Sequence, residues 1–169
     1  MKLFLIGLLG SGKSFLGKEL SKELKLPFID LDDILEKKEG MKVSEIFTAK
    51  GEEYFRMLEA AALREQNTQK KFVMATGGGT PCFHDNMSFI NQTGTSVFLN
   101  IPVSEIVKRL NGEQRKLRPL LANVPDDQLQ ATLEAMLQSR LQFYKQANIT
   151  VNAASTTAAD ILKRLQTKN

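Results

Sequence analysis

The segment from Gly7 to Ser14 constrains this chain more than any other. It reads Gly7-Leu8-Leu9-Gly10-Ser11-Gly12-Lys13-Ser14 and matches the phosphate-binding pattern G-x-x-x-x-G-K-[ST]. The apolar run Leu3–Ile6 precedes it, and Ser14–Leu24 follows with leucines at helical spacing, so the motif joins a buried strand to a helix. Glycines let backbone N–H groups curl around phosphates, and the helix N-terminus adds further donors. The sequence therefore predicts a phosphate-binding loop.

The side chains of this loop have separate expected contacts. Lys13 would reach the β- and γ-phosphates of a nucleotide, and the Ser14 hydroxyl would bind Mg²⁺. The alternative is a glycine-rich turn that matches by chance, but such a match is rare in a chain of this length. The residues expected to contact ATP here are Gly10, Ser11, Gly12, Lys13, Ser14 and Phe15.

Short apolar runs alternate with longer helical stretches along the 169 residues. This alternation is typical of βαβ units and predicts an α/β fold with a parallel sheet covered on both faces. The length fits one domain over residues 1–169, and the N-terminal apolar run is too short to cross a membrane. The expected strands are Leu3–Ile6, Pro27–Asp30, Phe72–Ala75, Ser96–Leu99 and Ile149–Val151. The expected helices are Ser14–Leu24, Asp32–Lys38, Glu52–Gln66, Val103–Leu110, Asp127–Ala147 and Ala158–Gln166.

The composition limits the kinds of binding partner and the cellular compartment that suit this chain. Lysine and arginine exceed aspartate and glutamate by four, 23 against 19. This surplus suits anionic small substrates, and no block of basic residues indicates nucleic-acid binding. Cys82 is the single cysteine, so no disulfide can form within the chain, which fits the reducing cytoplasm. We expect a protein that acts on small molecules, without nucleic acid or a membrane.

Two carboxylates follow the second expected strand. Asp30 and Asp32 stand at its carboxyl end, where open α/β sheets bind their ligands. One carboxylate can support Mg²⁺ through water, and the other can accept a hydrogen bond from an attacking hydroxyl. The same spacing is also typical of a helix N-cap followed by a solvated charge. Beside a phosphate-binding loop we favour the functional interpretation, and we expect the adjacent Asp33 to face solvent.

Arg56 and Glu59 lie three residues apart on one expected helix and so share a face. They can form an ordinary surface ion pair, or Glu59 can orient Arg56 toward a substrate carboxylate, which its planar guanidinium suits. The spacing alone does not decide between the two. The run Gly77-Gly78-Gly79 follows a buried strand and favours a loop whose backbone approaches a ligand closely, although a tight turn has the same composition.

A polar, basic stretch over residues 111–123 separates two expected helices and is interpreted as a lid. It contains Arg118-Pro119-Leu120-Leu121. A loop that closes over phosphates can insert an arginine where negative charge spreads in the transition state, and can exclude water. The alternative is a solvated basic loop. Arg140, one turn before Tyr144, is typical of an ordinary surface arginine when taken alone.

Together these motifs resemble the shikimate kinase family, from Gly7 to about Val151. Each later motif is weak singly, and their order and spacing carry the similarity. The resemblance implies an α/β, three-layer P-loop kinase fold with a five-stranded parallel sheet, helices on both faces and a small lid. It also implies phosphorylation of the 3-hydroxyl of shikimate by ATP with Mg²⁺, in the synthesis of aromatic amino acids, by a monomer.

The resemblance further implies roles for individual residues. Lys13, Asp32 and Arg118 would be catalytic, with Asp32 nearest the attacking oxygen and Arg118 on the γ-phosphate. Ser14 would bind Mg²⁺ directly and Asp30 through water. Arg109 would lie against the adenine. The residues that would bind shikimate are Asp32, Arg56, Gly78, Gly79 and Arg140.

The chain departs from the family pattern near its end. The segment Val151-Asn152-Ala153-Ala154-Ser155 is short and uncharged, where the family usually has an acidic residue and a longer adenine loop. The adenine contacts are therefore not predicted from it. Cys82 and His84 follow the glycine run, but one histidine and one cysteine cannot make a zinc site, so both are assigned to structure.

Three other functions remain as alternatives. A gluconate kinase shares the phosphate loop and an acidic acceptor site, but the two arginines and Arg-Pro-Leu-Leu favour shikimate. An adenylate-kinase-like enzyme needs a second nucleotide site and usually a longer chain. A nucleotide-binding module without catalysis would not need to keep the whole set of Lys13, Ser14, Asp30, Asp32 and Arg118.

Overall fold

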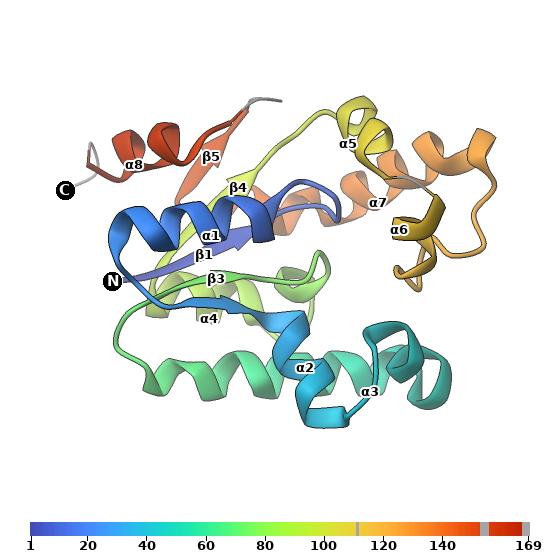
Figure 1. The fold of residues 1–169 in the computed structure, drawn as a ribbon, viewed down its shortest axis with the longest axis horizontal. Coiled ribbons are helices and arrows are strands. Elements are labelled where there is room, and N and C mark those ends of the chain that lie inside the picture. Colours follow the sequence, from blue (N-terminus) through green and yellow to red (C-terminus); the bar gives the residue numbers. More distant parts are fainter. Residues whose placement is uncertain (111, 153–155, 167–169) are drawn as a thin grey trace.

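A parallel five-stranded sheet forms the centre of the molecule (Figure 1). The computed structural model describes residues 1–110, 112–152 and 156–166. The strand order is β2-β3-β1-β4-β5, and each neighbouring pair is parallel. The strands are β1 (Lys2–Ile6), β2 (Phe28–Asp30), β3 (Phe72–Ala75), β4 (Thr95–Leu99) and β5 (Ile149–Val151). The expected parallel sheet is confirmed, with strand bounds within one residue of those expected.

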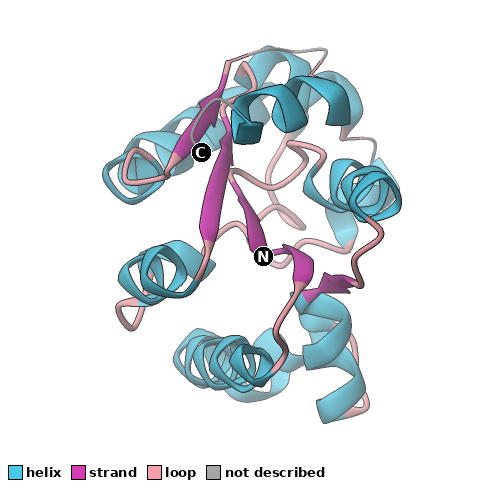
Figure 2. Cartoon of the chain, turned by 90° about the vertical axis from the view of Figure 1, so that its left-hand side faces the viewer, coloured by secondary structure: helices cyan, strands magenta, loops and turns pink. Residues whose placement is uncertain are grey.

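Helices cover both faces of the sheet and complete a three-layer α/β fold (Figure 2). One apolar core contains side chains of α1, α5, α7 and α8, and the core on the other face contains side chains of α2, α3, α4 and α7. The bounds of these helices are α1 (Lys13–Leu24), α2 (Leu31–Glu39), α3 (Val43–Glu65), α4 (Asn86–Thr93), α5 (Val103–Arg109), α7 (Leu129–Tyr144) and α8 (Ala158–Gln166). The short helix α6 (Gly112–Lys116) lies within the expected lid.

The central strand β1 shows why the sequence reads as a continuous apolar run. Leu3 and Leu5 belong to one core, and Phe4 and Ile6 belong to the other. A strand in the middle of a parallel sheet is buried on both faces, so every position must be apolar. β2 and β3 lie on one side of β1 in the sheet, and β4 and β5 lie on the other side. The chain therefore changes the side on which it adds strands next to β1, and open α/β sheets bind ligands at the carboxyl ends of the strands at such a point.

Three helical segments were absent from the sequence-based expectation. α3 begins at Val43 instead of Glu52, because Gly51 adopts a φ of 82° and only interrupts the helix. α4 is rich in polar residues and buries Met87 and Ile90, so its helical pattern is weak. α6 has five residues, too few for a periodic signal.

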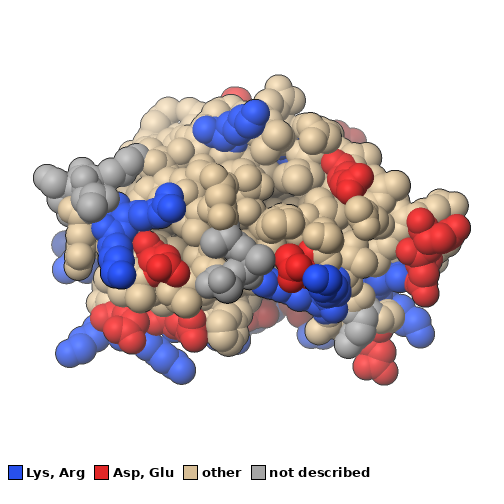
Figure 3. All heavy atoms as spheres, turned by 90° about the horizontal axis from the view of Figure 1, so that it is seen from above, with Lys and Arg blue, Asp and Glu red and all other residues tan. Residues whose placement is uncertain are grey.

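Charged side chains on the face seen from above are interspersed in sign (Figure 3). Basic and acidic groups stand beside one another around a largely uncharged centre. Binding to a nucleic-acid backbone requires a continuous basic surface, which this face does not offer. Within the described part of the chain, no helix combines the length and the apolar character needed to cross a membrane.

Candidate active site

The loop after β1 forms a cradle of backbone groups at the start of α1. Gly7, Gly10 and Gly12 have φ values of 142°, 73° and 94°, a region that residues with a side chain rarely adopt. Gly12 is the N-cap of α1. The first N–H groups of a helix have no partner within it, so this loop and helix end together provide donors for an anion.

Lys13 folds back over this loop. Its Nζ donates to the backbone oxygens of Gly7 and Leu8, both at 2.9 Å, and the residue is 8% exposed. Burial, and then the positive charge of Arg118, lower the pKa of Lys13 to about 7. A phosphate beside this ammonium group would favour its charged form, so the site gains from an anion.

Asp30 caps a helix and contacts the phosphate loop at the same time. Its Oδ1 accepts a hydrogen bond from the backbone N–H of Asp32 at 3.2 Å, which caps α2. Its Oδ2 accepts a hydrogen bond from Ser14 Oγ at 2.6 Å. Asp30 therefore caps α2 and also lines the cavity beside the phosphate loop.

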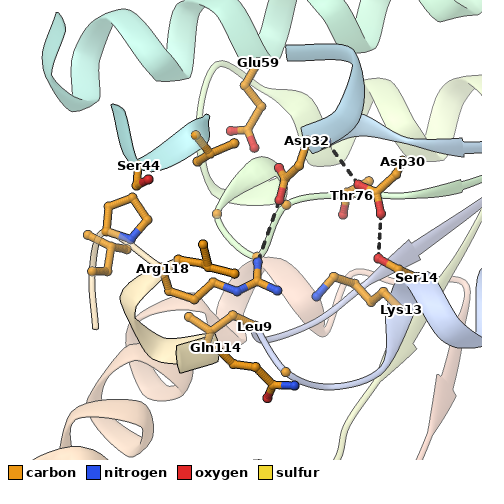
Figure 4. Close-up of a pocket in the computed structure, with 18 of the residues that line it drawn as sticks. Leu9, Lys13, Ser14, Asp30, Asp32, Ser44, Glu59, Thr76, Gln114 and Arg118 are labelled. Atoms are coloured by element: carbon orange, nitrogen blue, oxygen red, sulfur yellow. Dashed lines mark hydrogen bonds and ion pairs between the residues drawn. The ribbon is translucent and has the colours of Figure 1, made fainter. Parts of the chain in front are cut away.

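Asp32 lies in the first turn of α2 and points into the cavity toward Arg118 (Figure 4). Its Oδ2 is 3.8 Å from Arg118 Nη1. Burial, then the negative charges of Asp30 and Glu59, raise the pKa of Asp32 to about 6, although Arg118 opposes the shift. A carboxylate with a pKa near the working pH is suited to accept a proton. The adjacent Asp33 is exposed, as expected.

Arg56 and Glu59 form a buried pair, so the surface-pair alternative is wrong. Arg56 is 4% exposed and Glu59 is fully buried, and Arg56 Nη1 donates to Glu59 Oε2 at 2.9 Å. Glu52 Oε1 accepts hydrogen bonds from Nε at 3.2 Å and from Nη2 at 3.1 Å. The ring of Phe83 lies 4.5 Å from Arg56 Cζ. The guanidinium is thus held in one place at the cavity wall.

The glycine run after β3 lies against both arginines of the expected acceptor site. A Cβ on Gly79 would lie 2.5 Å from Arg56 Nη2, and a Cβ on Gly78 would lie 3.2 Å from Arg140 Nη1. Tyr144 Oη donates to the Gly78 carbonyl at 2.6 Å, and burial raises the pKa of Tyr144, so it remains a donor. The backbone of the glycine run therefore approaches both arginines closely. Arg140 is partly buried and lines the cavity.

A cavity of about 610 Å³ brings most of the predicted site together. Of the predicted residues, all of which are described, Ser11 alone does not line it. Ser11 lies beneath the loop, with its Oγ 3.5 Å from Lys13 Nζ and its N–H donated to the Leu8 carbonyl. The predicted residues that line the cavity are Gly10, Gly12, Lys13, Ser14, Phe15, Asp30, Asp32, Arg56, Gly78, Gly79, Arg109, Arg118 and Arg140.

Sequence reasoning missed the wall formed by the first half of α3. Val43, Ser44 and Phe47 line the cavity, and Figure 4 places Ser44 at the opposite end from Ser14. The apolar residues Val43 and Phe47 stand four apart, a helical spacing that was available in the sequence. Gly51 concealed it, because a glycine is usually a sign that a helix begins or ends nearby.

Two residues expected at the nucleotide side of the cavity are exposed to solvent. Phe15 is 67% exposed, and Arg109 is also exposed, with its Nη1 3.4 Å from the place of a Cβ on Gly12. The segment expected to lie near the adenine, residues 151–155, falls partly outside the described residues, since 153–155 are not described. Position 111 of the expected lid also lies outside them.

Cys82 and His84 do not line the cavity. Burial raises the pKa of the Cys82 thiol to about 11, so the group stays neutral. The backbone carbonyl of His84 accepts a hydrogen bond from Arg64 Nη2 at 2.7 Å. These contacts agree with the structural assignment of both residues.

The fold and the cavity define the class of the protein. Phosphoryl transfer needs donors that surround phosphates, cations that neutralise developing charge and a group that orients the attacking oxygen. Lys13, Arg118 and Asp32, groups of the kinds that these needs call for, line one cavity at the carboxyl end of β1, and the chain is a P-loop kinase. Within that class it belongs to the shikimate kinase family, whose model, described as Shikimate kinase, matches residues 9–168.

Individual relatives agree with the family. A shikimate kinase from Bacteroides thetaiotaomicron is 42% identical over 153 residues, which cover 90% of this chain and 87% of the relative. A crystal structure of shikimate kinase from the same species superposes with a TM-score of 0.89 at 38% identity, covering 99% of this chain and 97% of that one. Shikimate kinase from Acinetobacter baumannii, solved in complex with shikimate, gives a TM-score of 0.88 at 32% identity, covering 99% and 91%.

Proposed function

We propose that this chain transfers the terminal phosphate of ATP to the 3-hydroxyl of shikimate, giving shikimate 3-phosphate and ADP. The observation that carries the proposal is one cavity that joins a phosphate loop to two arginines and a carboxylate. Membership of the family supports the reaction, and the shikimate bound to the relative from Acinetobacter baumannii supports the acceptor.

The acceptor side of the cavity suits a small acid with several hydroxyls. Arg56 and Arg140 would bind the carboxylate, since a guanidinium matches a carboxylate with two parallel hydrogen bonds. Asp32 would accept hydrogen bonds from ring hydroxyls, while Gly78 and Gly79 would lie against the ring. A site built from buried polar groups rejects analogues that leave those groups unpaired, so we expect strong discrimination.

The nucleotide side would begin at the phosphate loop. Lys13 would leave the carbonyls of Gly7 and Leu8 for the β- and γ-phosphates, whose negative charge would favour the protonated amine and raise its lowered pKa. Residues Gly10 to Phe15 would surround the phosphates with backbone N–H groups. Arg109, at the rim, would lie against the base.

The residues present fit Mg²⁺. Ser14 Oγ and Asp30 Oδ2 lie 2.6 Å apart at the cavity wall and are hard oxygen ligands of the kind that Mg²⁺ prefers. We infer that Ser14 would bind the ion directly and that Asp30 would hold one of its waters. When bound, the ion would neutralise charge on the β- and γ-phosphates.

The chemistry follows from Asp32 and the cations around it. The substrate oxygen would attack the γ-phosphorus, its proton would pass to Asp32, and the bond from the γ-phosphorus to the bridging oxygen would break to release ADP. Lys13 and Arg118 would neutralise the charge that develops on the transferred group. The 3.8 Å between Arg118 and Asp32 supports a lid arginine that works within this cavity.

We propose further that one domain of one chain suffices, with residues 111–123 as a lid that closes over both substrates. Every group assigned above lies in this chain, so the proposed reaction calls for no second subunit, and we propose a monomer. Closure would exclude water from the γ-phosphate and so limit hydrolysis of ATP. We place the reaction in the cytoplasm, where ATP serves biosynthesis.

The decisive experiment is release of ADP from ATP and Mg²⁺ with shikimate, quinate, gluconate or no acceptor. We expect strong stimulation by shikimate alone. Stimulation by gluconate instead would leave the phosphate loop in place but refute the acceptor site. Binding of ATP with no stimulation by any acceptor would favour a nucleotide-binding module without catalysis.

A further inference from the structure

We propose that Thr80 is a positioning residue for the carboxylate of the acceptor: its hydroxyl fixes Glu59, and Glu59 fixes Arg56. The inference rests on the proposed function, in which Arg56 binds that carboxylate. Thr80 follows the glycine run and does not line the cavity, so it acts on the substrate only through these two side chains.

The carboxylate of Glu59 lies between two donors. Thr80 Oγ1 donates to Glu59 Oε1 at 2.5 Å, and Arg56 Nη1 donates to Glu59 Oε2 at 2.9 Å. Glu59 and Thr80 are both fully buried, so no water replaces either contact from bulk solvent. A buried carboxylate oxygen without a donor is costly, so Glu59 would turn to find one if the hydroxyl were removed. Arg56 would then lose its fixed partner.

The backbone of Thr80, which carries this hydroxyl, is itself held in place from two helices. The Thr80 carbonyl accepts a hydrogen bond from Asn86 Nδ2 at 2.9 Å, and Asn86 Oδ1 accepts one from Arg64 Nη1 at 2.6 Å. Asn86 begins α4 and is fully buried, while Arg64 stands in the last turn of α3. The Thr80 N–H donates to the Gly77 carbonyl at 3.2 Å. Thr80 therefore offers a rigid donor.

Close packing beneath the glycine run makes the position of Arg56 depend on the position of Glu59. A Cβ on Gly77 would lie 2.6 Å from Glu59 Oε1, and a Cβ on Gly79 would lie 2.5 Å from Arg56 Nη2. Glu59 and Arg56 thus fill the space beneath the glycine run, and neither can move without disturbing the other. A misplacement of about 1 Å at a binding group is enough to weaken recognition strongly.

Three variants test the proposal. Thr80→Val keeps the shape of the side chain and removes the donor, while Thr80→Ser keeps the donor. Thr93→Val is the matched control, because Thr93 donates its hydroxyl to the Phe89 carbonyl at 2.8 Å on α4, away from the cavity. We expect Thr80→Val to raise KM for shikimate about 10-fold, with KM for ATP unchanged and kcat within about twofold. Thr80→Ser and Thr93→Val should match the unmodified protein.

A double-mutant cycle separates positioning from general damage. In an Arg56→Lys background, Thr80→Val should change KM for shikimate less than about twofold, because the side chain it positions is gone. The same loss of effect is expected when the methyl ester of shikimate replaces the acid. If Thr80→Val does not fold, Thr80→Ala removes the hydroxyl without placing a second methyl beside Glu59, and the same outcomes apply.

Two results would overturn the inference while leaving the proposed function intact. One is an unmodified protein active on shikimate with a Thr80→Val variant of unchanged KM. The other is a Thr80→Val effect of equal size with and without Arg56, or equal for shikimate and ATP, which would indicate a merely structural role. Failure of the unmodified protein to bind or use shikimate would refute the proposed function and the inference together.

Discussion

The activity of this chain should be confined to a narrow range of pH, because two groups of the cavity have pKa values shifted toward neutrality. Burial raises the pKa of Asp32 to about 6 and lowers that of Lys13 to about 7. In the proposed reaction Asp32 must be deprotonated to accept a proton, and Lys13 must be protonated to bind phosphates. We expect the rate to fall about tenfold per pH unit below about pH 6 and, with the same slope, above about pH 7.

Two substitutions should each move both pH limits of activity in a known direction. Arg118 lowers the pKa of both groups, so Arg118→Ala should move the acid limb and the alkaline limb to higher pH. Asp30 raises both values, so Asp30→Asn should move both limbs to lower pH. Either variant also lowers the rate itself, and the positions of the limbs are the quantities to compare.

The assay is separation and quantification of ADP from pH 5 to pH 9, with excess Mg²⁺ and with both substrates well below their KM, so that the rate reports the free protein. Saturating ATP should move the alkaline limb upward, since phosphates favour the protonated form of Lys13. A rate that stays flat from pH 5 to pH 9, as expected if Asp32 and Lys13 kept their ordinary pKa values of 3.8 and 10.5, would refute the reasoning. So would a variant that moves the two limbs in opposite directions.

Three further substitutions test individual roles. Asp32→Asn should lower kcat by about 100-fold or more while calorimetry still detects ATP binding, and near-normal turnover would remove Asp32 from the chemistry. Arg118→Ala should lower kcat more than it raises KM for shikimate, whereas an effect on KM alone would limit Arg118 to ground-state binding. Gly79→Ala should raise KM for shikimate about 10-fold without changing KM for ATP, because its Cβ would lie 2.5 Å from Arg56 Nη2. An unchanged KM for shikimate in that variant would contradict the close packing beneath the glycine run.

The sheet was predictable because its signal is local. Most of β1, β3 and β4 is a short apolar run, and burial on both faces of the sheet requires that pattern. α4 gave no such signal, since its few buried side chains are spread over a polar sequence. The first half of α3 was hidden by Gly51, whose φ of 82° allows a break that the fold tolerates. Tertiary packing decides both segments.

In the candidate site, too, some features could be predicted from local sequence and others could not. The phosphate loop joins β1 to α1, and Asp30 ends β2, the next strand in sequence, so local patterns predict the chemistry of both. The burial of Arg56 and Glu59 could not be read from a spacing of three residues, which is equally typical of a surface pair. The role inferred for Thr80 depends on a hydrogen bond to a residue 21 positions away. Only the folded chain brings that pair together.

The pKa shifts of Lys13 and Asp32 lower the stability of the folded chain near neutral pH. The pKa of Lys13 in the folded chain lies below its ordinary value of 10.5, so the stability this group provides above that pH is lost as the pH falls toward 7. The pKa of Asp32 lies above its ordinary value of 3.8, so the stability present below that pH is lost as the pH rises through 6. Near neutral pH both groups therefore reduce the free energy of unfolding. A triphosphate beside Lys13 and Arg118 would offset the first cost, and a hydroxyl donated to Asp32 would offset the second. In the proposed reaction both substrates would thus supply counter-charges and hydrogen bonds to these groups, which would then be in place for transfer of the phosphate.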